Sequence, residues 1–224
     1  LKREAALAAA TLDRAAELTG VVNTLYRGPG ADDGPFSGAN TDVGGIVDAV
    51  RSGGVEQAGA VLVLGGGATA ASTVVAAAEL GATVLTIAVR TPEKASGAAG
   101  LAATLGLDAA VTTLDAVDGL AADVVVSTLP GGTELPRVPR RAIDDGALLL
   151  DAAYAPWPGS LVPLWSEGGA PIVHGLSMLV HQAAHQVRLF LGIGAEAWEE
   201  DAERVTAALF AVVGLDRSGR VAHS

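Results

Sequence analysis

A glycine-rich segment in the middle of the chain offers the most specific chemistry in the sequence. An uncharged apolar run at residues 60–64 leads directly into three glycines, and the helical pattern of residues 69–80 follows. Glycines at such a junction let the backbone turn sharply and approach a pyrophosphate, whose charge is stabilised by the helix N-terminus. Gly65, Gly67 and Ala70 satisfy the dinucleotide fingerprint G-x-G-x-x-G/A. Glycine turns are also common in structural loops, but the strand–turn–helix context favours a nucleotide site.

The residues after the next predicted strand, 83–89, indicate which nicotinamide cofactor is bound. An NAD site places an Asp or Glu here, where it binds the ribose hydroxyls. This sequence instead places Arg90 and Thr91 after the strand and Lys94 about one turn further on. Two cations and a hydroxyl suit the additional phosphate of NADP. Glu93 lies nearby, but at the start of a helix it can simply interact favourably with the helix dipole. Arg90 could be a simple solvated loop charge, but without the acid we expect NADP.

Lysine is rare in this sequence. Of the 14 basic residues only Lys2 and Lys94 are lysines, and the rest are arginines. The lysine amine is compact and titrates more readily than a guanidinium, so a chain that otherwise uses arginine can keep lysine where such an amine is needed. A lysine near a chain end is more often a solvated charge, so the pattern alone assigns no role.

Length, charge and cysteine content narrow the classes of function. The 224 residues, half of them apolar, suffice for one large domain or for one domain and part of a second. A formal net charge of -11 argues against binding to nucleic acid or to an anionic membrane surface. The absence of cysteine excludes disulfides and thiolate metal sites, and it fits a cytoplasmic protein.

Two histidines have a spacing that can hold a metal ion. His181 and His185 lie four positions apart in a segment with a helical pattern. No Glu follows His181 in the manner of H-E-x-x-H, and the sequence suggests no third ligand. We therefore expect no metal site.

The first 54 residues predict a small αβ unit. A helix is expected over residues 3–18, and a second over 43–51. Strands are expected over 21–27 and 36–39, with a glycine-rich hairpin loop between them. The Ser-Gly-Gly that ends at residue 54 would mark a domain boundary.

From residue 60 onward, strands and helices alternate. This alternation predicts an α/β fold, in which a Rossmann-like, doubly wound parallel sheet is preceded by a partial αβ substrate-binding domain. The expected domains are residues 1–54 for the substrate, 55–196 for NADP, and 197–224 for a C-terminal helix that packs back on the first domain, with a tail. The expected strands cover residues 60–64, 83–89, 109–112, 123–128, 147–150 and 171–173. The expected helices cover residues 69–80, 92–105, 161–167, 176–191 and 197–213, with a short one between 112 and 123.

A series of short motifs, in the same order along the chain, resembles the shikimate dehydrogenase family, which includes shikimate/quinate dehydrogenases. Each motif is short, but the ordered set extends over essentially the whole chain. The motifs are Leu1-Lys2, Val22-Asn23-Thr24, Asn40-Thr41-Asp42, the glycine loop at 65–70, Arg90-Thr91, Asp151-Ala152-Ala153-Tyr154-Ala155-Pro156 and Gly175-Leu176-Ser177-Met178-Leu179-Val180-His181-Gln182.

The resemblance implies a catalytic pair and a set of substrate contacts. Lys2 matches the family's catalytic lysine, and Asp42 matches its catalytic aspartate. Asn23 and Asp42 would bind the ring hydroxyls of shikimate. Gln182 would reach the substrate from the nucleotide domain, and Tyr154 would lie at the substrate pocket. Without the family, Asp42 could simply cap a helix and Asn23 could occupy a turn.

The resemblance also implies contacts to the cofactor. Gly175 would lie beside the nicotinamide with Met178 near it, although a core position is the structural alternative for Met178. Val89 departs from the family, which usually has an Asn before the arginine of the NADP clamp, and this departure leaves room for NAD. The pyrophosphate would be lined by Gly65, Gly66, Gly67 and Ala68, and the additional phosphate by Arg90, Thr91 and Lys94.

These residues predict oxidoreductase chemistry at a secondary alcohol. The cofactor takes the hydride, and the protein must handle the hydroxyl proton, which an adjacent amine and carboxylate can pass between them. The reaction that the resemblance implies is the reversible NADPH-dependent reduction of 3-dehydroshikimate to shikimate, in the chorismate route to aromatic amino acids. Two alternatives stay open: an NAD-dependent quinate/shikimate dehydrogenase, and a non-catalytic nucleotide-binding regulator of the same fold. The retained Lys2 and Asp42 argue against the regulator.

The start of the chain and one loop depart further from the family. The family's substrate domain begins well before its lysine and supplies a serine pair and a threonine to the substrate, whereas this chain opens on Leu1 rather than Met. We therefore expect an N-terminally truncated fragment. Trp157 stands where the family tends to have a threonine. The expected partner is the small-molecule substrate, not nucleic acid or membrane, in the cytoplasm, with a homodimer left open.

Overall fold

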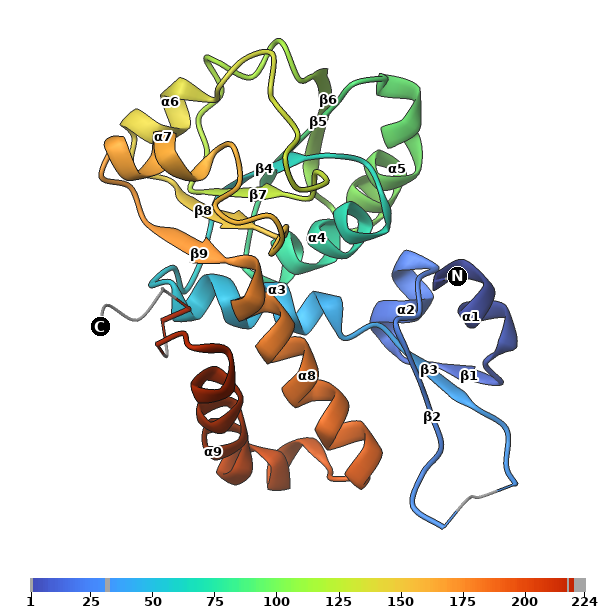
Figure 1. The fold of residues 1–224 in the computed structure, drawn as a ribbon. Helices are drawn as coiled ribbons and strands as arrows, with labels where there is room; N and C mark the ends of the chain where they lie inside the picture. Colours follow the sequence, from blue (N-terminus) through green and yellow to red (C-terminus); the bar gives the residue numbers. More distant parts are fainter. Residues whose placement is uncertain (1, 31–32, 217, 220–224) are drawn as a thin grey trace.

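Two β-sheets organise the chain in the computed structural model, which describes residues 2–30, 33–216 and 218–219 (Figure 1). A three-stranded sheet lies in the first part of the sequence, and a six-stranded sheet is built from residue 60 onward. Helices pack on both faces of the larger sheet. The predicted α/β, Rossmann-like fold class is therefore confirmed.

The small sheet is mixed and its strands are short. Its elements are α1 (Lys2–Ala8), β1 (Thr11–Leu12), α2 (Arg14–Thr19), β2 (Thr24–Tyr26) and β3 (Ser37–Ala39). The central strand β3 pairs in parallel with β1 and antiparallel with β2, which confirms the predicted hairpin. Strands of this length make few backbone hydrogen bonds, so side chains must fix much of the local geometry.

The single helix predicted over residues 3–18 is wrong, because the structure divides this segment into α1, β1 and α2. Asp13 causes the division: its Oδ1 accepts a hydrogen bond of 2.7 Å from the Ala16 N–H and so caps a new helix. The two residues just before Asp13 pair with β3. The alanine-rich composition favours a helix, but pairing with a distant strand overrides that preference.

The large sheet has the strand order of a dinucleotide-binding domain. Its strands are β4 (Ala60–Leu64), β5 (Val84–Val89), β6 (Asp108–Thr113), β7 (Val124–Ser127), β8 (Leu148–Asp151) and β9 (Ile172–His174). They lie in the order β6-β5-β4-β7-β8-β9, and every neighbouring pair is parallel. Numbered from β4, this is the order 3-2-1-4-5-6 of the Rossmann fold, which binds its ligand where the order reverses, between β4 and β7.

The helices follow the predicted pattern closely. They are α3 (Asp42–Ser52), α4 (Ala68–Glu79), the 3-10 helix η1 (Pro92–Ala95), α5 (Ser96–Thr104), α6 (Arg140–Asp144), α7 (Val162–Glu167), α8 (Gly175–Leu191) and α9 (Ala195–Val213). The helix predicted over 92–105 is divided into η1 and α5, and α6 was not predicted. Within the described residues, no helix is both long and apolar enough to cross a membrane.

The short helix predicted between residues 112 and 123 is wrong, since this segment forms turns. Leu114 and Val117 have helical spacing, and both are buried against the larger sheet. Asp118 and Gly119 follow at once, and such residues favour turns over helix. The spacing of two buried residues in a short segment therefore suggested a helix that the structure does not contain.

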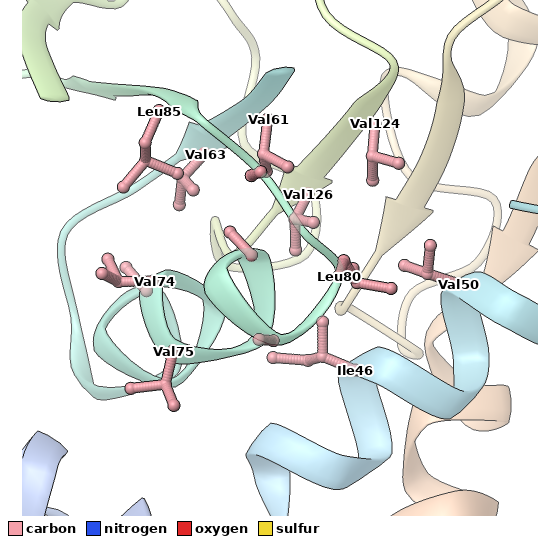
Figure 2. Packing of buried hydrophobic residues seen from close by; sticks show 14 of the residues in the cluster. Ile46, Val50, Val61, Val63, Val74, Val75, Leu80, Leu85, Val124 and Val126 are labelled. Carbon is pink, nitrogen blue, oxygen red and sulfur yellow. The ribbon is translucent and has the colours of Figure 1, made fainter. Parts of the chain in front are cut away.

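One face of the large sheet packs on α4 and on α3 (Figure 2). Val61 and Val63 point to this face because side chains alternate along a strand. Ile46 and Val50 of α3 lie against the same cluster near Leu80, and both are fully buried. Although α3 lies in the expected first domain, it is thus anchored in the core of the sheet. Each such side chain contributes about 1.5–3 kcal/mol by leaving water.

The opposite face packs on α6 and α7. Leu62 and Leu64 of β4 point to this side and are at most 1% exposed. Trp165 of α7 is fully buried there, and its indole N–H donates to the Ala147 carbonyl at 2.8 Å. Because both faces are covered here, the central strand β4 is apolar throughout.

Candidate active site

Lys2 and Asp42 lie side by side, although 40 positions separate them in the sequence. The Lys2 Nζ is 2.6 Å from the Asp42 Oδ2. Asp42 opens α3, where the helix dipole favours a carboxylate, and its side chain is 4% exposed. The Lys2 side chain is 39% exposed, so its amine is accessible to a ligand. A buried acid therefore holds an accessible amine, an arrangement that can exchange a proton with a substrate.

Asn23 occupies the second oxygen of the same carboxylate. Its Nδ2 donates to the Asp42 Oδ1 at 2.7 Å, while its Oδ1 accepts from the Thr41 N–H at 3.0 Å and the Thr24 hydroxyl at 2.8 Å. A backbone N–H can only donate, so the Asn23 oxygen must face Thr41 and the amino group must face Asp42. The orientation of the Asn23 amide is thereby fixed.

Asn40 ties the start of α3 to its neighbours. Its Nδ2 donates to the Thr19 hydroxyl at 2.9 Å and to the Ser72 hydroxyl of α4 at 3.0 Å. Its Oδ1 accepts from the Asp42 N–H at 3.2 Å. Because Asn40 is only 2% exposed, these bonds satisfy a polar group that would otherwise be costly to bury.

Two glutamines of α8 reach the same network. The Gln182 Oε1 lies 3.4 Å from the Asn23 Nδ2. The Gln186 Nε2 donates to the Thr24 hydroxyl at 3.1 Å and to the Thr41 hydroxyl at 3.4 Å. Since α8 begins directly after β9, this helix connects the large sheet to the residues around Asp42.

The glycine loop after β4 has the geometry of a phosphate cradle. Gly65 has φ +115°, and a Cβ there would collide with the Thr128 hydroxyl, so only glycine fits. A Cβ on Gly66 would lie 2.9 Å from a Val89 methyl, whereas one on Gly67 would meet nothing within 4 Å. Gly67 is the N-cap of α4 and has no side chain to cap it, which leaves the first backbone N–H groups, from Ala68 on, facing the loop.

Arg90, Thr91 and Lys94 gather at the end of β5, beside this loop. All three are exposed, and Lys94 is carried by η1. Val89, which stands where an Asn was expected, is 4% exposed and faces Gly66. Glu93 is exposed in the first turn of η1. The edge therefore presents two cations and a hydroxyl next to the cradle, as an additional phosphate requires.

Gly175 and Met178 lie at the start of α8. A Cβ on Gly175 would lie 2.7 Å from the carbonyl oxygens of Asp151 and Ala152, so a larger residue would push the helix from the sheet edge. Met178 is 7% exposed and belongs to the core cluster, while its carbonyl lies close to Gly45 of α3. Roles for these two residues toward a cofactor stay predictions.

The loop after β8 carries Tyr154 and is anchored by Trp157. Tyr154 is 55% exposed. The Trp157 ring stacks on His174 with centroids 3.7 Å apart and planes 27° apart. His174 in turn caps α8, because its Nδ1 accepts from the Leu176 N–H at 2.9 Å. Burial lowers the pKa of His174, which keeps it in the neutral form that can accept this bond.

Asp151 lies in register between Ser127 and His174 at the carboxyl ends of β7, β8 and β9. All three are buried. Burial raises the pKa of Asp151, while hydrogen bonds from the Ala153 N–H and from Ser127 act in the opposite direction. A Cβ on Gly159 would collide with the Asp151 carboxylate, so the loop folds tightly over it. These contacts hold the loop that presents Tyr154.

The two histidines with metal-ligand spacing have other surroundings. The His185 Nε2 lies 2.8 Å from the Asp48 Oδ2 of α3. The His181 ring meets Phe210 of α9 edge-on at 5.2 Å, and burial lowers its pKa. Across the described ranges, no group of three or more potential metal ligands occurs.

Several members of the network around Asp42 were not predicted from the sequence. Thr24, Asn40 and Thr41 lie inside the motifs but were not predicted to belong to the site, since Asn40 and Thr41 were expected only as helix caps; Gln186 and Asp13 lie outside the motifs. Gln186 lies one helical turn after Gln182, so the i, i+4 rule could have found it once α8 was known to face the small sheet.

Comparisons with known proteins place this arrangement in a family. No protein-family model matches the chain. The NADP(+)-dependent shikimate dehydrogenase of Methanocella arvoryzae is 36% identical over 197 residues, which cover 85% of this chain and 70% of that protein. The chain belongs to the shikimate dehydrogenase family. The family predicted from the ordered motifs is thus confirmed.

Solved structures agree with this assignment. The crystal structure of shikimate dehydrogenase from Mycobacterium tuberculosis is 34% identical, with a TM-score of 0.72, and the match covers 92% of this chain and 75% of that one. Quinate dehydrogenase from Corynebacterium glutamicum, solved with NAD, has a TM-score of 0.78 at 23% identity, covering 94% of this chain and 74% of that one. At this identity, the match to quinate dehydrogenase shows only that this chain shares its fold.

Proposed function

We propose that this chain catalyses the reversible NADPH-dependent reduction of 3-dehydroshikimate to shikimate. The observation that carries the proposal is the 2.6 Å contact between the Lys2 amine and the buried Asp42 carboxylate. Membership of a family whose relative from Methanocella arvoryzae is named an NADP(+)-dependent shikimate dehydrogenase supports both the reaction and the cofactor. A regulator without catalysis would have no use for this pair.

The glycine loop and the end of β5 would hold NADP. Gly67 leaves space for the pyrophosphate at the N-terminus of α4, which Ala68 opens, while Gly65 and Gly66 form the tight turn before it. Arg90 and Lys94 would bind the additional phosphate, with the Thr91 hydroxyl as a third donor. When bound, the nicotinamide supplies the hydride. Gly175, where the carbonyls of Asp151 and Ala152 exclude a side chain, would lie beside it.

Lys2 would handle the proton. In the direction of reduction, the Lys2 Nζ gives a proton to the ketone oxygen, which becomes the hydroxyl oxygen. In the reverse direction, the Lys2 Nζ removes the proton from that hydroxyl. Asp42 holds the amine in place through the 2.6 Å contact. The Asn23 amino group on the other carboxylate oxygen prevents Asp42 from turning away.

The same residues would orient the substrate ring. Asn23 and Asp42 are both within reach of a ligand that contacts Lys2, and their polar atoms suit ring hydroxyls. Gln182 approaches Asn23 from α8 and would add a contact from the side of the large sheet. Tyr154, exposed on the loop after β8, would add a further substrate contact.

Other expectations stay predictions. These are the division into domains at residues 1–54, 55–196 and 197–224, the cytoplasmic location and the homodimer. In the structure α9 packs on α8, through Phe210 and Val180 among others.

A direct assay tests the proposal with the protein as its gene encodes it. NADPH consumption is followed after addition of 3-dehydroshikimate, and the reverse reaction is compared for shikimate with NADP and quinate with NAD. The proposal predicts the faster rate with shikimate and NADP. A faster rate with quinate and NAD would favour the alternative dehydrogenase, and cofactor binding without any turnover would favour the regulator.

A further inference from the structure

We propose that Gln186 is a positioning residue for this reaction, an inference that rests on the proposed function. Gln186 lies on α8 one turn beyond Gln182, and its side chain is partly buried. Among the described residues, Gln186 makes no hydrogen bond to Lys2 or Asp42. Its hydrogen-bond partners are the hydroxyls of Thr24 and Thr41, at 3.1 and 3.4 Å. Its effect on the catalytic pair must therefore pass through those hydroxyls.

The direction of each hydrogen bond follows from donor counting. A threonine hydroxyl has one proton and two lone pairs. The hydroxyl oxygens of Thr24 and Thr41 lie 2.8 and 3.2 Å from the Asn23 Oδ1, and the Thr41 hydroxyl oxygen also accepts from the Asn23 Nδ2 at 3.0 Å with one of its lone pairs. When both protons point to Asn23, both hydroxyl oxygens present lone pairs toward α8. The Gln186 amide supplies two N–H groups on one nitrogen, and these match the two lone pairs. Gln186 thus holds both protons on Asn23.

The consequence reaches Asp42 through Asn23. With the Thr24 and Thr41 hydroxyls and the Thr41 N–H all donating to its oxygen, the Asn23 amide cannot turn over without setting donors against donors. Its amino group therefore stays on the Asp42 Oδ1, which leaves Oδ2 for Lys2. Gln186 thus orients the Asp42 carboxylate indirectly, through the threonine hydroxyls and then through Asn23.

Gln186 also connects the two halves of the molecule. It is carried by α8, whose first residue, Gly175, is pressed against the edge of the large sheet. Thr24 lies on β2 of the small sheet. The amide therefore fixes the catalytic network relative to the nucleotide-binding edge, a task that a purely apolar contact could not perform with the same directionality.

Two substitutions of similar size separate this role from packing. Gln186→Met removes both N–H groups, and kcat should fall about tenfold, the equivalent of one net hydrogen bond. Gln186→Glu can only accept at neutral pH, so it draws the hydroxyl protons away from Asn23 and adds a negative charge near Asp42. Its kcat should fall about a hundredfold. In both variants KM for NADPH should stay within about twofold, because the glycine loop is untouched.

Gln57→Met, at an exposed position before β4, is the matched control and should leave kcat and thermal stability unchanged. A cycle with Thr24→Val adds a second measure: the double variant Thr24→Val/Gln186→Met should lose less than the product of the two single losses, since both act on one bond.

The outcomes distinguish this inference from the proposed function. If the wild type is active and both Gln186 variants turn over at the wild-type rate, the inference about Gln186 is overturned but the proposed function is not. Equal losses of kcat in Gln186→Met and Gln186→Glu, accompanied by a fall in Tm, also overturn the inference, because that pattern indicates a loss of packing. A wild-type protein that reduces no 3-dehydroshikimate overturns both. A Glu variant that loses more kcat than the Met variant at unchanged Tm and unchanged KM for NADPH supports it.

Discussion

The two sheets of this molecule are stabilised by different physics. The six-stranded sheet is held by buried aliphatic side chains on both faces, and its glycine loop needs only a turn and a helix N-terminus. The small sheet has strands of two or three residues, and polar side chains fix the positions of Asn23 and Asp42. Changes in the polar contacts around Asn23 and Asp42 should therefore reduce turnover but leave cofactor binding largely unchanged.

The largest effect is expected from Asp42→Asn. The amide keeps the size of the side chain and can still accept from Asn23, but it no longer holds a charged Lys2. We expect kcat to fall about 10³-fold, within the range for loss of acid–base catalysis. The dissociation constant for NADPH, measured by fluorescence titration, should be unchanged.

Asp108→Asn, at an exposed position that opens β6, is the control and should behave as the wild type. Weakened NADPH binding in Asp42→Asn would contradict the proposed separation of the two sites.

A core substitution tests the other side of the comparison. Ile46→Ala on α3 should reduce the free energy of unfolding by about 2–5 kcal/mol, because Ile46 is fully buried between α3 and the large sheet. Urea unfolding measures the change. Val212→Ala, at a side chain that is 83% exposed on α9, should change stability by less than about 0.5 kcal/mol. Equal stability of both variants would show that α3 is not part of the core.

A cofactor substitution is expected to have a smaller effect. Arg90→Ala removes one of the two cations at the end of β5, and KM for NADPH should rise about 10- to 30-fold. KM for NADH should hardly change, because NADH lacks the additional phosphate. Arg140→Ala, an exposed arginine of α6, serves as the control. If both cofactors weaken equally, Arg90 does not bind that phosphate.

The smallest effect concerns pH. Burial lowers the pKa of His174 below its ordinary value of 6.5. As pH falls below about 6.5, the unfolded chain therefore takes up a proton that the folded chain resists, and stability is lost. His174→Asn can still cap α8 but does not titrate. Its Tm should fall less than that of the wild type between pH 7.5 and about pH 5.5.

His181, whose pKa burial also lowers, remains in that variant, so part of the pH dependence should persist. An identical slope of Tm against pH in wild type and His174→Asn would refute the contribution of His174.

The same contrast explains what the sequence could predict. The centre of the large sheet was predictable because its strands are apolar runs joined to helices by short turns, so β4 matches its predicted range and β5, α4 and α8 begin within one residue of theirs. The strand β1 was not, since two residues paired with β3 carry no periodic signal.

Prediction of the site divides along similar lines. The motif order indicated Lys2, Asn23, Asp42 and Gln182, and the structure brings these four side chains into one network. Gln186 could not be found in this way, because its contacts depend on the angle at which α8 meets the small sheet. Such hydrogen bonds between distant elements are tertiary properties that spacing along one chain does not encode.

The most direct test of the central claim is a single-turnover measurement with Lys2→Ala. Wild type and variant, each in excess over a limiting amount of bound NADPH, are mixed with saturating 3-dehydroshikimate, and the single oxidation of that NADPH is followed by its absorbance, with Arg3→Ala as the neighbouring control. The account predicts that the variant consumes NADPH at least about a hundredfold more slowly while binding it with the same affinity. Consumption at the wild-type rate in Lys2→Ala would contradict it.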